Sequence, residues 1–87
     1  MKPYIESRKL IKYTLRMPKA FSSFFYFSLE SHENLAFYST LSHEVGQAYR
    51  DILVRTTPEL DSELSGLISH CQKKGDIEIL ERVIEES

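Results

Sequence analysis

The sequence predicts an α+β fold in which the elements follow the order strand, helix, strand, strand, helix, strand. Two observations carry this prediction. Apolar and polar residues alternate from residue 9 to 17, which is typical of a strand with one buried face. Residues 48–74 then form a unit with the features of a strand, a Thr-Pro turn and an amphipathic helix. The other segments are interpreted around these two.

The strand of this unit spans residues 48–56 and is rich in β-branched and aromatic residues, which strands favour. Side chains alternate between the two faces of a strand. One face would carry Ala48, Ile52 and Val54, with Arg50 among them, and would meet the core. The opposite face would carry Tyr49, Asp51, Leu53 and Arg55, and it would be open or contact a partner.

The helix of the unit has a start signal, an apolar stripe and a stop signal. Thr57 is suited to cap its first amides, and Pro58 is suited to the first helical position. The apolar residues recur at helical spacing: Leu60, Leu64, Leu67, Ile68 and Cys71. Gly75 is a natural end.

The N-terminal half predicts a strand followed by a helix. In the strand at 9–17, one face is apolar (Ile11, Tyr13, Leu15 and Met17), and Pro18 ends it. Residues 20–33 fit a helix rich in phenylalanine, although 24–29 also fit a strand by propensity. We favour the helix, because Pro18 provides an entry and a further strand would need a stronger turn signal.

The remaining segments complete the pattern. Residues 35–41 predict a second strand, and 42–47, which contain Gly46, predict a hairpin loop into the strand at 48–56. The C-terminal segment fits two structures. Alternation favours a strand from Ile77 to about Glu81 with a frayed or helical tail, whereas a Glu78–Arg82 pair at helical spacing fits a short helix.

This order is that of the ferredoxin-like α+β sandwich, in which two helices cover one face of an antiparallel sheet. We expect a single domain at 10–87 after a loose lead-in at 1–9. The face without helices would carry Lys12, Thr14, Arg16, Tyr49, Leu53 and Arg55. A mixed face of this kind often contacts a second subunit or a ligand, so Lys12, Arg16, Tyr49, Leu53 and Arg55 are the predicted interface residues.

The 87 residues have a net charge of −2, which favours no class of partner, but the charges are unevenly distributed. Basic residues dominate positions 1–20, and acidic residues dominate positions 76–87. Solvated ends of opposite sign are the simplest interpretation. An anion-attracting first strand and head-to-tail contacts between subunits are the other two.

Several features bear on location. The single cysteine, Cys71, excludes an internal disulfide and fits the apolar stripe as a small hydrophobic residue. No apolar run approaches the length of a membrane span, and residues 20–29 lack the exit pattern of a signal peptide. We therefore expect a cytoplasmic protein without membrane contact.

The chain resembles the regulatory ACT domains in the strand ending Arg16-Met17-Pro18, the helix from Ala20, the strand at 36–41, and Ile52-Leu53-Val54 before the second helix. Over residues 10–74 it also resembles a family of short, uncharacterised bacterial proteins. These similarities lie at 27–30, at Leu35-Ala36 and 39–41, and at 57–59, 63–64 and 67–68. The resemblance implies an ACT-like fold and small-molecule sensing at a subunit interface.

Residues with catalytic or metal-binding potential form no recognisable constellation. His32, His43 and His70 lie on different expected elements without a close ligand pair, so no metal site is predicted. Ser39 and Thr40 have no accompanying histidine and acid for nucleophilic chemistry. The chain also lacks a phosphate-binding glycine loop. We therefore expect a protein that is not an enzyme and binds no cofactor.

The preferred hypothesis is a small, non-enzymatic regulatory or protein-interaction domain that acts as a homodimer. One alternative is a small-ligand or anion sensor, with Pro18, Lys19 and Ala20 at the binding site because a helix N-terminus offers unpaired amides. The other alternative is nucleic-acid binding by the open sheet face.

The basic and aromatic residues available for nucleic-acid binding are Tyr13, Tyr49, Lys12, Arg16, Arg50 and Arg55. The absence of an RNA-recognition signature and of a net basic charge disfavours it.

Overall fold

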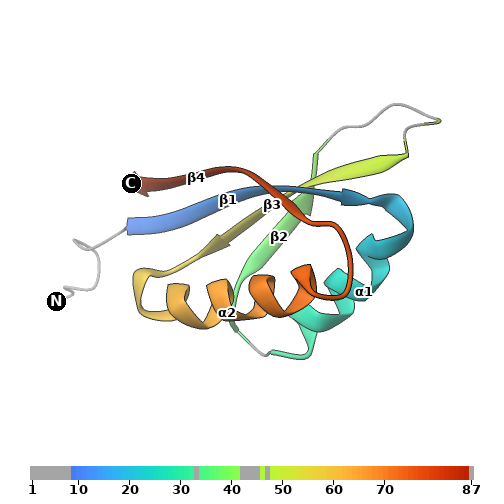
Figure 1. Cartoon of the computed structure of the whole chain (residues 1–87). Helices are drawn as coiled ribbons and strands as arrows, with labels where there is room; N and C mark the ends of the chain where they lie inside the picture. The colour runs from blue at the N-terminus through green and yellow to red at the C-terminus, as the bar shows by residue number, and fades with distance from the viewer. Residues whose placement is uncertain (1–8, 33, 42–45, 47, 87) are drawn as a thin grey trace, which may run out of the picture.

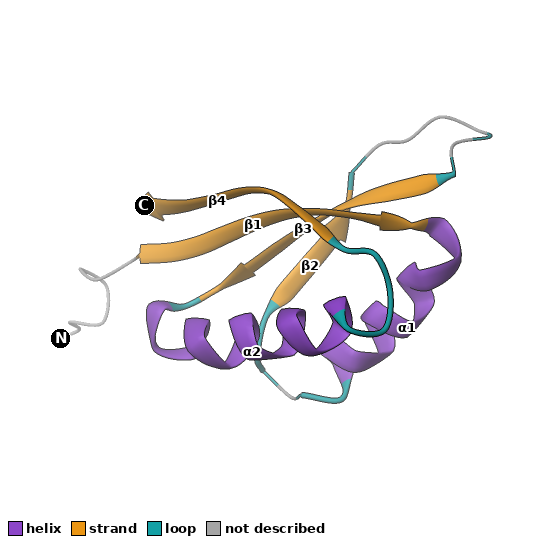
Figure 2. Cartoon of the chain, viewed as in Figure 1, coloured by secondary structure: helices purple, strands orange, loops and turns teal. Residues whose placement is uncertain are grey.

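The protein, seen in a computed structural model that describes residues 9–32, 34–41, 46 and 48–86, has an α+β architecture. The elements are β1 (Lys9–Pro18), α1 (Lys19–Glu30), β2 (Phe37–Thr40), β3 (Tyr49–Thr56), the 3-10 turn η2 (Pro58–Leu60), α2 (Asp61–Gln72) and β4 (Glu78–Glu86). The strands form one antiparallel sheet in the order β2-β3-β1-β4. Both helices lie on the same side of it (Figures 1 and 2), an arrangement compatible with a ferredoxin-like fold.

The alternation of β1 positions the core, as the sequence predicts. Every second residue of the strand is buried against the helices: Ile11, Tyr13, Leu15 and Met17. The predicted core face of β3 is likewise buried at Ile52 and Val54, whereas Ala48, predicted on the same face, precedes the strand and is exposed. The helices contribute Phe25, Leu29, Leu64, Ile68 and Cys71 to the same cluster. One layer of side chains between sheet and helices therefore forms the core.

The segment after β1 is a helix, and the strand alternative for residues 24–29 is wrong. Pro18 ends the strand, and α1 begins at once with Lys19, whose N–H donates to the carbonyl of Ala48 at 2.9 Å. This hydrogen bond ties the start of the helix to the beginning of β3. Ser22 is buried in the first turn, and its hydroxyl donates to the Lys19 carbonyl at 2.7 Å.

The second strand is shorter than expected, spanning Phe37–Thr40 instead of 35–41. Leu35 precedes the strand but is buried in the core, and its carbonyl accepts a hydrogen bond from the Thr56 hydroxyl at 2.7 Å. This local anchoring explains why an apolar residue here does not extend the ladder. The predicted hairpin loop lies outside the described residues except for Gly46, as do residues 1–8 of the lead-in predicted at 1–9. The last residue of that lead-in, Lys9, is instead the first residue of β1.

The second helix starts later than predicted. Pro58–Leu60 form a 3-10 turn in which the Leu60 N–H donates to the Thr57 carbonyl at 3.1 Å, and α2 begins at Asp61. The Thr57 side chain makes no capping hydrogen bond, so the predicted cap is wrong. The stripe itself is confirmed, because Leu64, Ile68 and Cys71 are buried.

The C-terminal segment is a strand throughout, and the expected helical tail is wrong. β4 runs from Glu78 to Glu86 along the outside of β1. Its register shifts between Thr14 and Leu15 of β1, which is the mark of a β-bulge. As a result Ile79 pairs with Leu15, and Ile84 pairs with Ile11, although the two isoleucines are five positions apart. The bulge thus breaks the simple alternation.

Candidate functional site

The sheet has one face that no helix covers, here called the open face (Figure 2). Directly opposed residues of antiparallel strands lie on the same face, so the register defines its members. They are Leu10, Lys12, Thr14 and Arg16 of β1, Phe37 and Ser39 of β2, Tyr49, Asp51, Leu53 and Arg55 of β3, and Glu78, Glu81, Val83 and Glu85 of β4. All predicted interface residues are brought together on this face.

The charged side chains of the open face are largely paired with one another. Arg16 donates to Asp51 through Nε to Oδ1 at 2.8 Å and through Nη2 to Oδ2 at 3.0 Å. Arg55 donates from Nε to Glu85 Oε1 at 3.0 Å, and the Lys12 ammonium lies 3.7 Å from the same carboxylate. These cations hold the pKa of both carboxyls, Asp51 and Glu85, below their usual values. The open face therefore carries ion pairs across three strands.

These pairs also explain the uneven charge of the sequence. The basic first strand and the acidic last strand are neighbours in the sheet, so their charges meet within one chain. Lys12 with Glu85 and, more loosely, Lys9 with Glu86 at 3.8 Å are the direct contacts. Attraction between separate subunits is not needed to account for the pattern.

Apolar and aromatic side chains lie between the ion pairs. Phe37 is 82% exposed, opposite Arg55 at the β2 edge. Tyr49 is partly exposed, and the Arg16 guanidinium lies over its ring at 4.8 Å from the centroid. Leu53 and Val83 are half-buried by their neighbours on the same face. The open face is thus mixed, with its apolar atoms accessible.

The basic and aromatic set considered for nucleic acid is divided between the two faces. Tyr13 is only 3% exposed and faces the helices. Arg50 pairs with the core residue Met17, so it also lies on the helix side, where its Nη1 is 3.4 Å from the Ser22 hydroxyl. Lys12, Arg16, Tyr49 and Arg55 share the open face, but the three cations among them are engaged with carboxylates. Among the described residues, these side chains therefore form no continuous basic aromatic surface.

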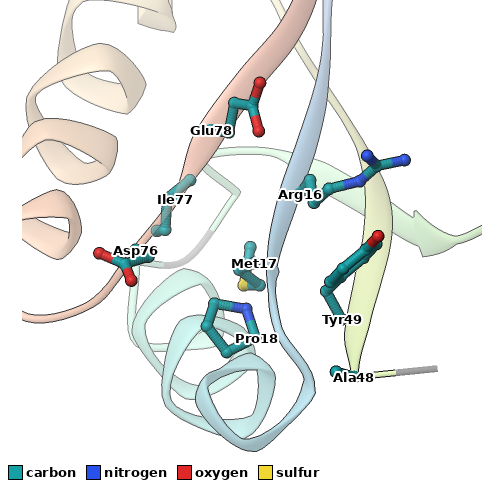
Figure 3. A pocket seen from close by; sticks show the side chains of 8 residues that line it. All are labelled: Arg16, Met17, Pro18, Ala48, Tyr49, Asp76, Ile77 and Glu78. Carbon is teal, nitrogen blue, oxygen red and sulfur yellow. The ribbon is translucent and has the colours of Figure 1, made fainter. Parts of the chain in front are cut away.

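A cavity of about 510 Å³ lies where β1 ends and β4 begins (Figure 3). Its lining consists of Arg16, Met17, Pro18, Ala48, Tyr49, Asp76, Ile77 and Glu78. In Figure 3, Met17 and Pro18 lie between Tyr49 on one side and Ile77 on the other. Of the predicted ligand residues, Pro18 lines the cavity, whereas Lys19 and Ala20 do not.

A hydrogen-bonded group that the sequence did not indicate fastens β4 to the second helix. The Tyr13 hydroxyl donates to Asp61 Oδ1 at 2.8 Å and accepts from Arg82 Nε at 3.2 Å, and Arg82 Nη2 donates to Asp61 Oδ2 at 2.7 Å. Burial raises the pKa of the Tyr13 phenol. The three residues come from β1, α2 and β4, and only the tertiary fold brings them together. The group holds the elements in place.

A smaller hollow of about 210 Å³ lies near the end of α1, lined in part by Glu30, His32 and Tyr38. Tyr38 stacks on Tyr26 with centroids 4.7 Å apart and donates its hydroxyl to Glu30, which raises the pKa of the Tyr38 phenol. His32 Nδ1 lies 2.8 Å from the carbonyl of Ser28. Most polar groups here are therefore already satisfied by the chain.

Two further findings limit the chemistry. Among the described residues, no three His, Cys, Asp or Glu side chains gather to hold a metal ion; His43 lies outside them. In the same part of the chain, no helix is both long and apolar enough to cross a membrane. Comparisons with protein-family models, curated proteins and solved structures found no match.

Proposed function

We propose that the protein is a small, non-enzymatic regulatory or interaction module of ACT-like fold that acts in the cytoplasm as a homodimer through its open face. The observation that carries this proposal is the combination of accessible apolar side chains with charges that are already paired. Phe37, Tyr49 and Leu53 offer contact area, and they lie among the ion pairs of Arg16 and Arg55. Since these guanidinium groups keep a carboxylate partner on association, covering them leaves neither guanidinium unpaired.

A second copy fits this face better than a highly charged partner does. The open face mixes both signs, with Lys12, Arg16 and Arg55 among Asp51 and Glu85. A surface that carries both signs of charge attracts a polyanion only weakly. In a symmetric dimer, however, its positive residues can lie against the negative residues of the second copy. A face of mixed polarity around apolar residues is also the usual anatomy of a protein–protein interface.

The open face is favoured over the free edge of β4 for this contact. The edge strand carries Glu78, Glu81, Glu85 and Glu86 against Arg82 alone. A two-fold pairing of this edge with itself would oppose several like charges, which is destabilising. Charged edge strands of this kind are a common means of preventing pairing with other sheets.

Molar mass in solution, measured by light scattering over a range of protein and salt concentrations, tests the proposal. A dimer is expected for the natural sequence. Leu53→Glu and Phe37→Ser, on the open face, are expected to shift the mass toward the monomer. Phe27→Glu is the matched control, because Phe27 is an exposed residue of α1 on the opposite side of the molecule. A natural chain that stays monomeric at every concentration, or a loss of dimer only with Phe27→Glu, overturns the proposal.

A small-ligand sensor is the second candidate, and the cavity beside Pro18 is the observation that favours it. The anion form of this hypothesis has less support. The Lys19 N–H at the start of α1 already donates to Ala48, and Arg16 is held by Asp51. A thermal-shift screen of amino acids, nucleotides and organic acids tests whether the protein binds a small ligand. If none of these compounds stabilises the protein, the sensor hypothesis is wrong for those ligands.

Nucleic-acid binding is the third hypothesis and the least supported. Its basic and aromatic residues do not share one face, since Tyr13 and Arg50 are on the helix side. A gel-retardation assay at low salt, where phosphate contacts are strongest, is the appropriate test. We expect no retardation of single-stranded DNA or RNA. Retardation that Arg55→Ala abolishes would reverse this ranking.

A further inference from the structure

The cavity at the end of β1 has the size and the floor of a small-molecule site. Its volume of about 510 Å³ lies in the range that accommodates small organic ligands. The accessible apolar lining consists of Pro18, Ala48 and the ring of Tyr49, while Met17 and Ile77 border the cavity as buried core residues. A ligand with a hydrocarbon body can therefore displace water from the floor of the cavity.

The polar part of the lining determines which charge the cavity accepts. Asp76 and Glu78 are exposed, and neither forms an ion pair with any other residue that the structure describes. The one cation of the lining, Arg16, is engaged by the carboxylate of Asp51 through two hydrogen bonds. The remaining charge at the cavity is therefore negative, which attracts a cation and repels an anion.

The two sides of the cavity differ in chemistry. Figure 3 shows the carboxylates of Asp76 and Glu78 on the β4 side and the ring of Tyr49 on the β3 side. The Arg16 guanidinium lies over the Tyr49 ring, and the ring is still partly exposed. A flat or flexible carbon body can contact this ring while its charged end faces the carboxylates.

We propose that this cavity binds a small organic cation, namely an alkyl or aryl ammonium. The hydrocarbon part lies against Pro18, Ala48 and the Tyr49 ring, and the ammonium group faces Glu78 and Asp76. The proposal refines the second candidate function by naming the ligand class. Arg16 and Tyr49 line the cavity and also lie on the open face, so the molar mass is measured with and without the ligand. A chain that binds the ligand as a monomer, or dimerises without binding it, separates the failure of one proposal from that of the other.

The test is a titration of isotope-labelled protein followed by amide chemical shifts, with 2-phenylethylammonium as the probe. The matched probe is 3-phenylpropanoate, which has a similar body and the opposite charge. For a fragment of this size we expect a dissociation constant of roughly millimolar order for the amine. The shifts should centre on Met17, Ala48 and Ile77, and the acid should bind at least about five-fold more weakly.

Two pairs of variants make the outcome decisive. Asp76→Asn combined with Glu78→Gln should weaken amine binding about five-fold while reducing its salt dependence, because two exposed charges are removed. Glu59→Gln combined with Glu63→Gln is the control, since both residues are exposed at the start of the second helical segment and away from the cavity. Equal binding of the acid, shifts centred elsewhere, an unchanged affinity in the first pair, or no amine binding at all overturns the proposal.

Discussion

Arg16 and Asp51 face each other across β1 and β3, with both nitrogen–oxygen pairs of a bidentate ion pair formed, at 2.8 Å and 3.0 Å. The two residues are also directly opposed in the strand register. Their side chains remain partly exposed, at 39% and 26%. The sheet places the two residues opposite each other, so their side chains lose little conformational entropy when the pair forms.

This pair predicts an acid-sensitive contribution to stability. Arg16 lowers the pKa of Asp51 below its ordinary value of 3.8 in the folded state. Stability from this group is therefore complete above the ordinary pKa and is lost as pH falls through the lower, folded value. Asp51→Asn should cost up to about 1 kcal/mol at neutral pH, and the difference from the natural chain should shrink at about pH 3. Urea unfolding at both pH values measures this.

Glu81→Gln is the control for this experiment, because Glu81 is an exposed carboxyl on the same face with no ion pair to another described residue. It should change stability little at either pH. A difference between Asp51→Asn and the natural chain that stays constant from neutral to acid pH would contradict the role given to the pair.

Much of the sheet could be predicted from sequence because its central strands obey simple alternation. β1 has one face in the core and one open, so Ile11 to Met17 alternate without interruption. β4 could not be read in the same way. Its bulge places Ile79 and Ile84 on the same side although they are five positions apart, and strict alternation would place them on opposite sides. Because β4 is an edge strand, Ile84 is also 58% exposed, so its apolar character does not mark a core position.

The Tyr13 hydroxyl provides the second prediction. It is buried and links Asp61 with Arg82, so Tyr13→Phe leaves these groups with one hydrogen-bond partner fewer while keeping the ring in the core. We expect a loss of about 1 kcal/mol in the free energy of unfolding. Tyr49→Phe is the control, because Tyr49 is partly exposed and its hydroxyl has no protein partner in the described part of the chain. Equal effects of the two substitutions would contradict the prediction.

Only part of the candidate site can be predicted from the sequence. Of the cavity lining, the sequence predicts Pro18 as a ligand residue because a helix starts beside it, and it predicts Arg16 and Tyr49 as interface residues of the open face. It predicts no role for Asp76 and Glu78, because they follow α2 and meet the end of β1 only in the folded chain. Likewise, the predicted site at Lys19 and Ala20 assumed free helix amides, and the Lys19 N–H is used by Ala48.

The third prediction concerns the close packing of Gly75 against a neighbouring side chain. A Cβ at this position would lie 2.6 Å from ring atoms of Phe21, far inside van der Waals contact. Gly75→Ala should therefore destabilise the fold by about 1–3 kcal/mol. In the background of Phe21→Ala the same change should cost much less, since the ring is gone. Thermal or urea unfolding of the four proteins gives this double-mutant cycle.

Gly66→Ala is the matched control for the Gly75 cycle. Gly66 lies inside α2, and a Cβ there would meet nothing within 4 Å. Alanine is the better helix former, so this substitution should stabilise the protein by about 0.5–1 kcal/mol. A destabilisation at Gly66, or additive effects of the Gly75 and Phe21 substitutions, would count against the packing shown by the structure.

Cys71 allows a fourth prediction, because it is the single cysteine of the chain and is fully buried between the helices and the sheet. Burial raises the pKa of its thiol, and only the thiolate reacts readily. A thiol reagent such as Ellman's should therefore modify the folded protein far more slowly than the urea-unfolded protein. The rate in the folded protein should be proportional to the small fraction of molecules that is transiently open.

Ile68→Ala, which removes a buried neighbour in the same stripe, should destabilise the fold and speed the modification of Cys71. Leu60→Ala, at a half-buried position before α2, should speed it less. Rapid modification of the natural protein at neutral pH would show that the helix layer does not protect this thiol.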